Sequence, residues 1–324
     1  MTLILAATVG HHVFHTSDRL ITVPSRVKNR SQAWDIASNK TVIVVASDCW
    51  LVIGYTGLAY LDGIPTDQFI AEAISGQKNL AGSGISAWGL PADKMHYRSI
   101  TSRLSAAIEN AYTRLPSHVR RYPTTILGAG LQHATPRLRQ VMFETVHCES
   151  GTTHTELAKR HVPSQTFHVN AVGSYNPLVH GMLRQALKRH GSTSAHKFQS
   201  LMTDAVRTTG QMSDVVGEDV LAVTLQPTER RIEVTFNQAD TSIQIPMPAG
   251  AGDDPDQWAD HPRVYTPFAL LPGMIFHPAV ASVGGWNTTI DKGPPLEYTI
   301  SGRGLNPRQG RFYYGSHPRK QPPS

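Results

Sequence analysis

The stretch TLILAATVGHHVFHTSDRL, residues 2–20, decides the fold of this chain. Residues 2–9 form an apolar run rich in β-forming side chains, Gly10 and the two histidines after it supply a turn, and residues 13–16 return as a second strand. A hairpin is therefore predicted at the start of the chain. It places Thr2 directly behind Met1, at the first position of a buried strand.

The composition is that of a globular protein. With 324 residues, of which 40% are hydrophobic, the chain can form one large domain with an appendage. No stretch approaches the roughly 20 apolar residues of a membrane helix, and no signal peptide pattern precedes the first strand. We therefore expect a cytoplasmic protein without membrane contact, and we expect its two cysteines, Cys49 and Cys148, to be buried free thiols.

The net charge of +6 is unevenly distributed, because residues 301–324 carry five basic side chains and no acidic one. Such a tail could contact an anionic partner. Five scattered charges in a segment rich in Pro and Gly are more typical of a solvated, disordered end. A nucleic-acid partner is therefore not expected.

The order of the predicted elements indicates the fold class. Residues 41–57 form a second hairpin, split at Ser47 and Asp48, and helical spacing follows over residues 66–74 and 93–115. The remaining elements are strands over 122–131, 137–146 and 165–173, helices over 177–191 and 194–210, and strands over 218–226 and 230–236. Strands alternate with pairs of helices, so we predict an α+β protein built as a four-layer αββα sandwich.

The composition changes near residue 240, where we place a domain boundary. Residues 1–240 form the predicted domain, and residues 241–324 form an extension rich in Pro and Gly. Within it, residues 264–290 are too apolar for a free linker, so we expect them to pack onto the domain or a neighbouring subunit. Residues 303–324 are expected to be mobile.

Residues 2–236 resemble the proteasome β-subunit type of N-terminal nucleophile (Ntn) hydrolases. In that family an N-terminal threonine attacks a carbonyl, and its own α-amine or an ordered water is the base. The resemblance implies that removal of Met1 exposes Thr2, with Asp18 sixteen residues later as the family aspartate. Lys40 and Gly54 keep the family's fourteen-residue separation, although Lys40 comes later in the chain, as a loop insertion would produce.

The resemblance also implies a role for each of these residues. The Lys40 ammonium favours deprotonation of the threonine hydroxyl, Asp18 keeps Lys40 charged and oriented, and the Gly54 N–H receives the oxyanion. In GSYNP, residues 173–177, Ser174 matches the serine that holds the amine or its water. Tyr175 and Asn176 depart from the family's glycine and serine, and Tyr175 would narrow the pocket.

The family's second acid and serine fall on TTGQMSDVVGEDV, residues 208–220. An ungapped alignment puts Gln211 at the acidic position and Asp214 at the serine position. Either Ser213 and Asp214 exchange the two roles after a small shift, or this part of the site is altered. The sequence leaves both alternatives open.

Each of these residues alone also has an ordinary structural explanation. Asp18 could be a turn residue, Ser174 a helix cap and Lys40 an exposed charge at a strand edge. His11, His12 and His15 point in different directions around a tight turn, so no metal site is predicted, and no cofactor is expected. GAG at residues 128–130 is interpreted as close packing in a strand rather than a phosphate loop.

The sequence therefore predicts a threonine-nucleophile amide-bond hydrolase, a proteasome-like peptidase acting on a peptide or protein. The resemblance further implies a homo-oligomer, possibly a ring, with a possible unfoldase or regulatory partner. The alternative is a catalytically inactive Ntn-fold scaffold or partner-binding subunit. Retention of Met1 would favour this alternative, because it blocks the free amine.

Overall fold

The fold is described from a computed structural model. It describes residues 2–24, 31–35, 38–80, 85–87, 95–134, 137–162, 167–174, 181, 195–237, 239, 266–277, 280–281, 284–288, 296–303 and 313–314. Apart from Gly181, the helix predicted over 177–191 lies outside these residues, as do Tyr175, Asn176 and most of the 303–324 end.

The first large sheet has seven strands and contains the predicted N-terminal hairpin. Its order is β13 (Phe167–Gly173), β1 (Leu3–Val9), β2 (His12–Asp18), β14 (Val220–Gln226), β15 (Arg231–Asn237), β20 (Leu296–Arg303) and β19 (Gly284–Thr288). β1 and β2 pair antiparallel across the turn at Gly10, whose φ of +54° suits glycine. The hairpin that opens the sequence is thus confirmed, and it lies between β13 and β14 in this sheet.

The second large sheet has eight strands. Its order is β12 (Gly151–His161), β11 (Arg137–Cys148), β10 (Thr124–Ala134), β6 (Cys49–Thr56), β5 (Thr41–Val45), β16 (Phe268–Leu271), β17 (Met274–Phe276) and β9 (Ile85–Ser86). Three small pairs complete the strands: β3 (Ile21–Pro24) with β4 (Ser31–Asp35), β7 (Tyr60–Leu61) with β8 (Ile64–Pro65), and β18 (Val280–Ala281) with β21 (Tyr313–Tyr314). The predicted β5–β6 hairpin is present and antiparallel.

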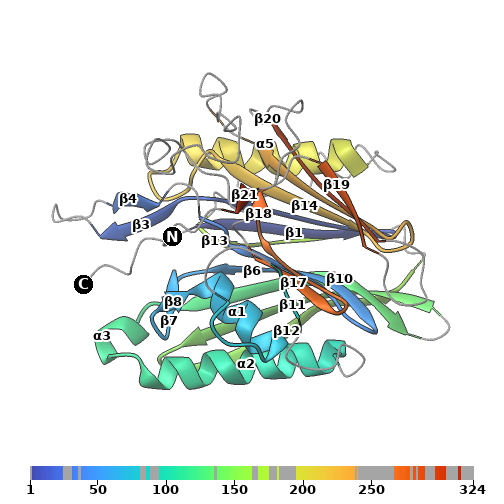
Figure 1. Ribbon diagram of the computed structural model, residues 1–324. Helices are drawn as coiled ribbons and strands as arrows, with labels where there is room; N and C mark the ends of the chain where they lie inside the picture. The colour runs from blue at the N-terminus through green and yellow to red at the C-terminus, as the bar shows by residue number, and fades with distance from the viewer. Residues whose placement is uncertain are drawn as a thin grey trace.

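Helices cover the outer face of each large sheet, so the chain is an α+β protein (Figure 1). The helices are α1 (Thr66–Ser75), α2 (Tyr97–Arg114), the short α3 (Ser117–Arg120) and α5 (Ala195–Gln211). α1 and α2 pack on the eight-stranded sheet, and α5 packs on the seven-stranded sheet. α2 begins four residues later than predicted, where Asp48 in the β5–β6 turn accepts the Tyr97 N–H at 2.8 Å.

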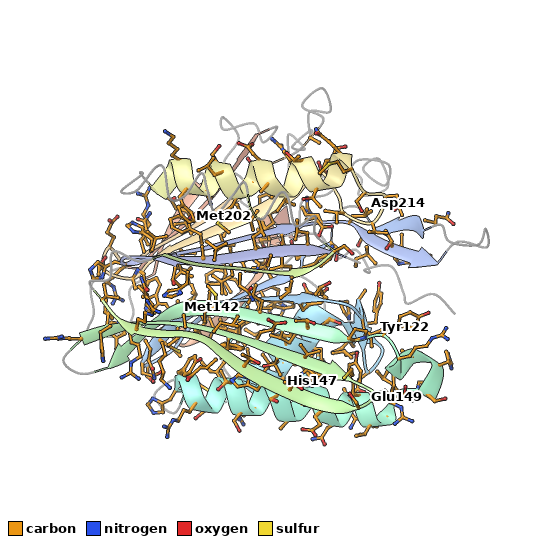
Figure 2. The ribbon with its side chains drawn as sticks, turned by 180° about the vertical axis from the view of Figure 1, so that it is seen from behind. Tyr122, Met142, His147, Glu149, Met202 and Asp214 are labelled. Atoms are coloured by element: carbon orange, nitrogen blue, oxygen red, sulfur yellow. The ribbon has the colours of Figure 1, made fainter. Side chains whose placement is uncertain are left out.

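Three apolar clusters hold these parts together. One fills the space between the two sheets, one lies beneath α1 and α2, and one lies beneath α5. Beneath α5, the Phe14 and Phe198 rings stack at 4.7 Å, and Met202 points from the helix towards the strands (Figure 2). In β10, a Cβ on Gly128 would lie 2.2 Å from the Phe143 ring, so the predicted close packing of GAG is confirmed.

Part of the C-terminal extension is built into the eight-stranded sheet. β16 pairs parallel with β5, and β17 returns beside it. Phe268 and Leu270 of β16 join the cluster beneath α1 and α2, while Ala269 and Leu271 join the cluster between the sheets. β16 thus contributes to the apolar cluster between the sheets and to the one beneath α1 and α2. The domain boundary near residue 240 remains a prediction.

No helix in the part of the chain that the structure describes is both long enough and apolar enough to cross a bilayer.

Candidate active site

Thr2 lies at the N-terminal end of β1, where a special backbone geometry holds it. The Ser174 N–H donates a hydrogen bond of 2.7 Å to the Thr2 carbonyl oxygen. The preceding residue, Gly173, has a φ of +98°, and a Cβ there would lie 1.9 Å from that same oxygen. Only glycine permits this approach. The structure therefore brings the Ser174 backbone next to Thr2, and the role of Ser174 in holding the amine or its water stays a prediction.

Asp18 ends β2 and is fully buried beside Thr2. Its Oδ1 accepts hydrogen bonds from the Thr2 hydroxyl and, at 2.8 Å, from the Leu3 N–H. Its Oδ2 accepts three more, from the Lys40 ammonium at 2.9 Å and from the Leu20 and Gly217 N–H groups at 3.1 Å. A carboxylate offers about four lone-pair sites, so this buried charge is fully satisfied.

Lys40 is only 3% exposed and directs its ammonium at the Thr2 hydroxyl. Besides donating to Thr2 Oγ1, the ammonium donates to Asp18 Oδ2 at 2.9 Å and to the Leu20 carbonyl at 2.5 Å. Burial lowers the pKa of Lys40, and the charge of Asp18 opposes that change. Thr2 Oγ1 thus donates to a carboxylate and accepts from an ammonium, an arrangement suited to activating a hydroxyl nucleophile.

Gly54 is enclosed by neighbouring strands of the eight-stranded sheet. It lies inside β6 between β5 and β10, and a Cβ there would be 2.3 Å from His15 Nε2. Because the Tyr55 N–H faces β5, where it donates to the Lys40 carbonyl at 3.1 Å, the Gly54 N–H faces β10. The role of the Gly54 N–H as an oxyanion donor stays a prediction. The small size of Gly54 accommodates His15.

His15 is buried between the two sheets. Its Nδ1 lies 3.4 Å from Thr41 Oγ1, which in turn lies 3.2 Å from Ser17 Oγ. Burial lowers the pKa of His15 to about 3, so the imidazole is neutral at physiological pH. Strand alternation was the signal for this placement, because residues 13, 15 and 17 share the inward face of β2.

Ser213 and Asp214 are not brought to Thr2. Asp214 is exposed beyond the C-terminal end of α5 (Figure 2), and Ser213 Oγ accepts the Val215 N–H at 3.4 Å. The segment reaches the site through the Gly217 N–H on Asp18, and a Cβ on Gly217 would lie 2.8 Å from Leu20 Cβ. The prediction that these two side chains exchange catalytic roles is therefore corrected, since a backbone group takes this position.

Arg19 is a buried residue of the site that sequence reasoning missed. Its guanidinium lies 5.3 Å from the centre of the Phe236 ring, and its charge contributes to lowering the pKa of Lys40. Its position directly after Asp18 was the available signal. Arg19 thus adds a second positive charge whose field reaches Lys40.

Across the described ranges, no three His, Cys, Asp or Glu side chains converge in a way that could hold a metal ion.

No protein-family model matches the sequence, and no curated protein does. Among solved structures, the chain is similar to eukaryotic HslV from Trypanosoma brucei, at 13% identity and a TM-score of 0.36, over 69% of this chain and 99% of that one. It is also similar to a Gly-1 mutant of Anbu from Hyphomicrobium sp. strain MC1, at 12% identity and a TM-score of 0.43, over 70% of this chain and 82% of that one.

Proposed function

We propose that this chain is a threonine-nucleophile amide-bond hydrolase with an αββα Ntn-hydrolase fold, a proteasome-like peptidase. Thr2 is the nucleophile, and removal of Met1 exposes its α-amine. The observation that carries the proposal is the buried cluster in which the Thr2 hydroxyl contacts both Asp18 and Lys40. The proposal includes a cytoplasmic location, association into a homo-oligomer and a peptide or protein substrate.

The proposed reaction has two steps, acylation of Thr2 and hydrolysis of the resulting ester. In the first, Thr2 Oγ1 attacks the substrate carbonyl carbon, and the α-amine of Thr2 takes the hydroxyl proton and passes it to the leaving amine. The product is an ester between Thr2 and the acyl part of the substrate. In the second, a water attacks this ester and the amine again relays the proton, which releases a carboxylic acid and restores the hydroxyl.

Asp18 and Lys40 make this chemistry possible near neutral pH. A free α-amine has an ordinary pKa of about 7.7–8.0, and a cation beside it favours the neutral form that acts as a base. The Lys40 ammonium also stabilises negative charge developing on Thr2 Oγ1. Asp18 binds Lys40 and the Leu3 N–H, so it fixes both the cation and the first peptide group of β1.

The test is hydrolysis of peptides that carry an amide-linked fluorescent reporter. Thr2→Ala should abolish turnover while leaving the circular dichroism spectrum and melting temperature close to those of the parent protein. Thr2→Ser, which keeps a hydroxyl, is the matched control and should retain measurable turnover. Parental turnover in Thr2→Ala would refute the nucleophile assignment.

The alternative function, an inactive scaffold or partner-binding subunit, is favoured by one observation. Within the described hydrogen bonds, neither Ser213 nor Asp214 contacts Thr2. These two residues therefore do not supply the second acid and serine of the family pattern. A preparation with Met1 removed that still cleaves no peptide, yet sediments as a stable oligomer, would support it. Sedimentation as a monomer at micromolar concentration would instead contradict the proposed homo-oligomer.

A further inference from the structure

β16, a strand of the C-terminal extension, lies beside β5, the strand that begins directly after Lys40. β16 and β5 run parallel, with Phe268 opposite Val42 and Leu270 opposite Val44. The same offset, carried two residues towards the N-terminus, puts Thr266 level with Lys40. A segment more than 220 residues away in sequence thus reaches the end of β5 where the proposed active site begins.

Asn39 links these two segments. Its Nδ2 donates a hydrogen bond of 2.6 Å to the Thr266 carbonyl oxygen, and both residues are at most 3% exposed. The Asn39 carbonyl in turn accepts from the Tyr55 hydroxyl at 3.3 Å. The residue before Lys40 is therefore held by β6 on one side and by the C-terminal segment on the other.

Lys40 has little freedom to absorb a shift of this backbone. An ammonium has three N–H groups, and those of Lys40 are used on Thr2 Oγ1, Asp18 Oδ2 and the Leu20 carbonyl. A displacement of Lys40 along β5 must therefore lengthen at least one of these bonds. Positioning errors of about 1 Å can lower a rate by about 100-fold.

We infer that Asn39 is a positioning residue which, through the Thr266 carbonyl, makes the C-terminal strand part of the active-site scaffold. This inference rests on the proposed function of Thr2 and Lys40. The Asn39–Thr266 bond fixes the start of β5, β5 fixes Lys40, and Lys40 orients the Thr2 hydroxyl. β16 thus supports the site through the Thr266 carbonyl and Asn39.

The experiment compares Asn39→Ala with Gln140→Ala in the full-length protein. Gln140 is a matched control, because it is fully buried and its Nε2 donates at 2.9 Å to the Gly10 carbonyl, at the end of β1 opposite Thr2. Both variants lose a buried amide-to-carbonyl bond of the same kind. Circular dichroism and thermal melting first establish that both are folded.

Two readouts test the positioning role. For hydrolysis of a reporter peptide, Asn39→Ala should lower kcat by roughly 10- to 100-fold, leave KM within about twofold and shift the pH midpoint of kcat. In a titration followed by NMR of lysine labelled with ¹³C at Cε, Asn39→Ala should raise the pKa of Lys40, because a loosened site admits water. Gln140→Ala should change neither readout.

The outcomes separate the inference from the proposed function. If both variants behave alike in kcat and in the Lys40 titration, the inference is overturned and the hydrolase proposal stands. If the parent protein has no turnover, the hydrolase proposal fails. In that case the Lys40 titration still decides whether Asn39 positions the lysine.

Discussion

Asp18 and His15 lie three residues apart in β2 and are both fully buried, but their hydrogen-bonding environments are opposite. Asp18 accepts from two side chains and three backbone N–H groups. His15 has one long contact, of 3.4 Å, to Thr41, and its Nε2 has no hydrogen-bond partner within the described structure. Burial is tolerated at Asp18 because the charge is compensated, and at His15 because the ring is neutral.

The largest effect is expected from removing the carboxylate of Asp18, the residue whose buried charge is compensated. Asp18→Ala leaves Lys40 buried without its carboxylate and removes an acceptor from three backbone N–H groups. We expect a loss of about 3–5 kcal/mol in the free energy of unfolding, measured by urea denaturation. Asp214→Ala, at an exposed acid, is the control and should stay within about 0.5 kcal/mol of the parent. Equal stability of the two variants would contradict the conclusion that the hydrogen bonds accepted by Asp18 stabilise the fold.

A smaller effect is expected from adding a methyl group at Gly54, which lies against the neutral ring of His15. In Gly54→Ala the new Cβ would lie 2.3 Å from His15 Nε2, so the buried His15 ring must move. We expect a cost of about 1–3 kcal/mol in the free energy of unfolding. Adding His15→Ala should remove most of the extra cost, and additive costs in this double-mutant cycle would show that the two residues do not compete for space.

The pH dependence of stability should report His15 itself. Its pKa is lowered to about 3 from an ordinary value of 6.5, so between these pH values the unfolded chain binds a proton that the folded chain does not. Stability therefore falls as the pH falls through this window, by up to about 1.4 kcal/mol per pH unit for this group. Denaturation of His15→Leu across the window should show a shallower slope. Parallel slopes for the parent protein and the variant would show that His15 does not contribute to the pH dependence of stability.

The smallest effect is expected at Ser213 and Asp214, two predicted site residues that make no described hydrogen bond to Thr2, Asp18 or Lys40. Ser213→Ala and Asp214→Asn should leave turnover of a reporter peptide within about twofold of the parent, because neither side chain contacts Thr2, Asp18 or Lys40 in the described hydrogen-bond network. A loss of tenfold or more in kcat for either variant would restore the predicted second pair. Circular dichroism would accompany both assays.

The Thr2–Asp18–Lys40 cluster was predicted from the resemblance to the family, and local strand pairing explains why Thr2 and Asp18 meet. A short hairpin brings its two ends together, and the pairing of Ile4 with Ser17 places Thr2 and Asp18 at the same edge. Lys40 was found from its spacing to Gly54, although Gly54 itself turned out to face His15. Spacing along a chain identifies which strand a residue belongs to, but not the direction in which its N–H points.

The rest of the site depends on contacts without a local signal. The loop after α5 approaches Asp18 through a backbone N–H of Gly217, which leaves no trace in a pattern of side chains. The parallel pairing of β16 with β5 joins segments more than 220 residues apart. No turn or periodic pattern between them encodes that register, so only an apolar segment in need of cover was predictable.

The most direct test of the central claim is the mass of the N-terminal peptide after the protein is incubated with a β-lactone, an electrophile that acylates activated hydroxyl groups. We expect Met1 to be absent and one acyl group to be bound to Thr2, with much slower labelling in Lys40→Ala. A peptide that retains Met1, or a Thr2 that stays unlabelled while exposed threonines react, would contradict the assignment of Thr2 as the nucleophile.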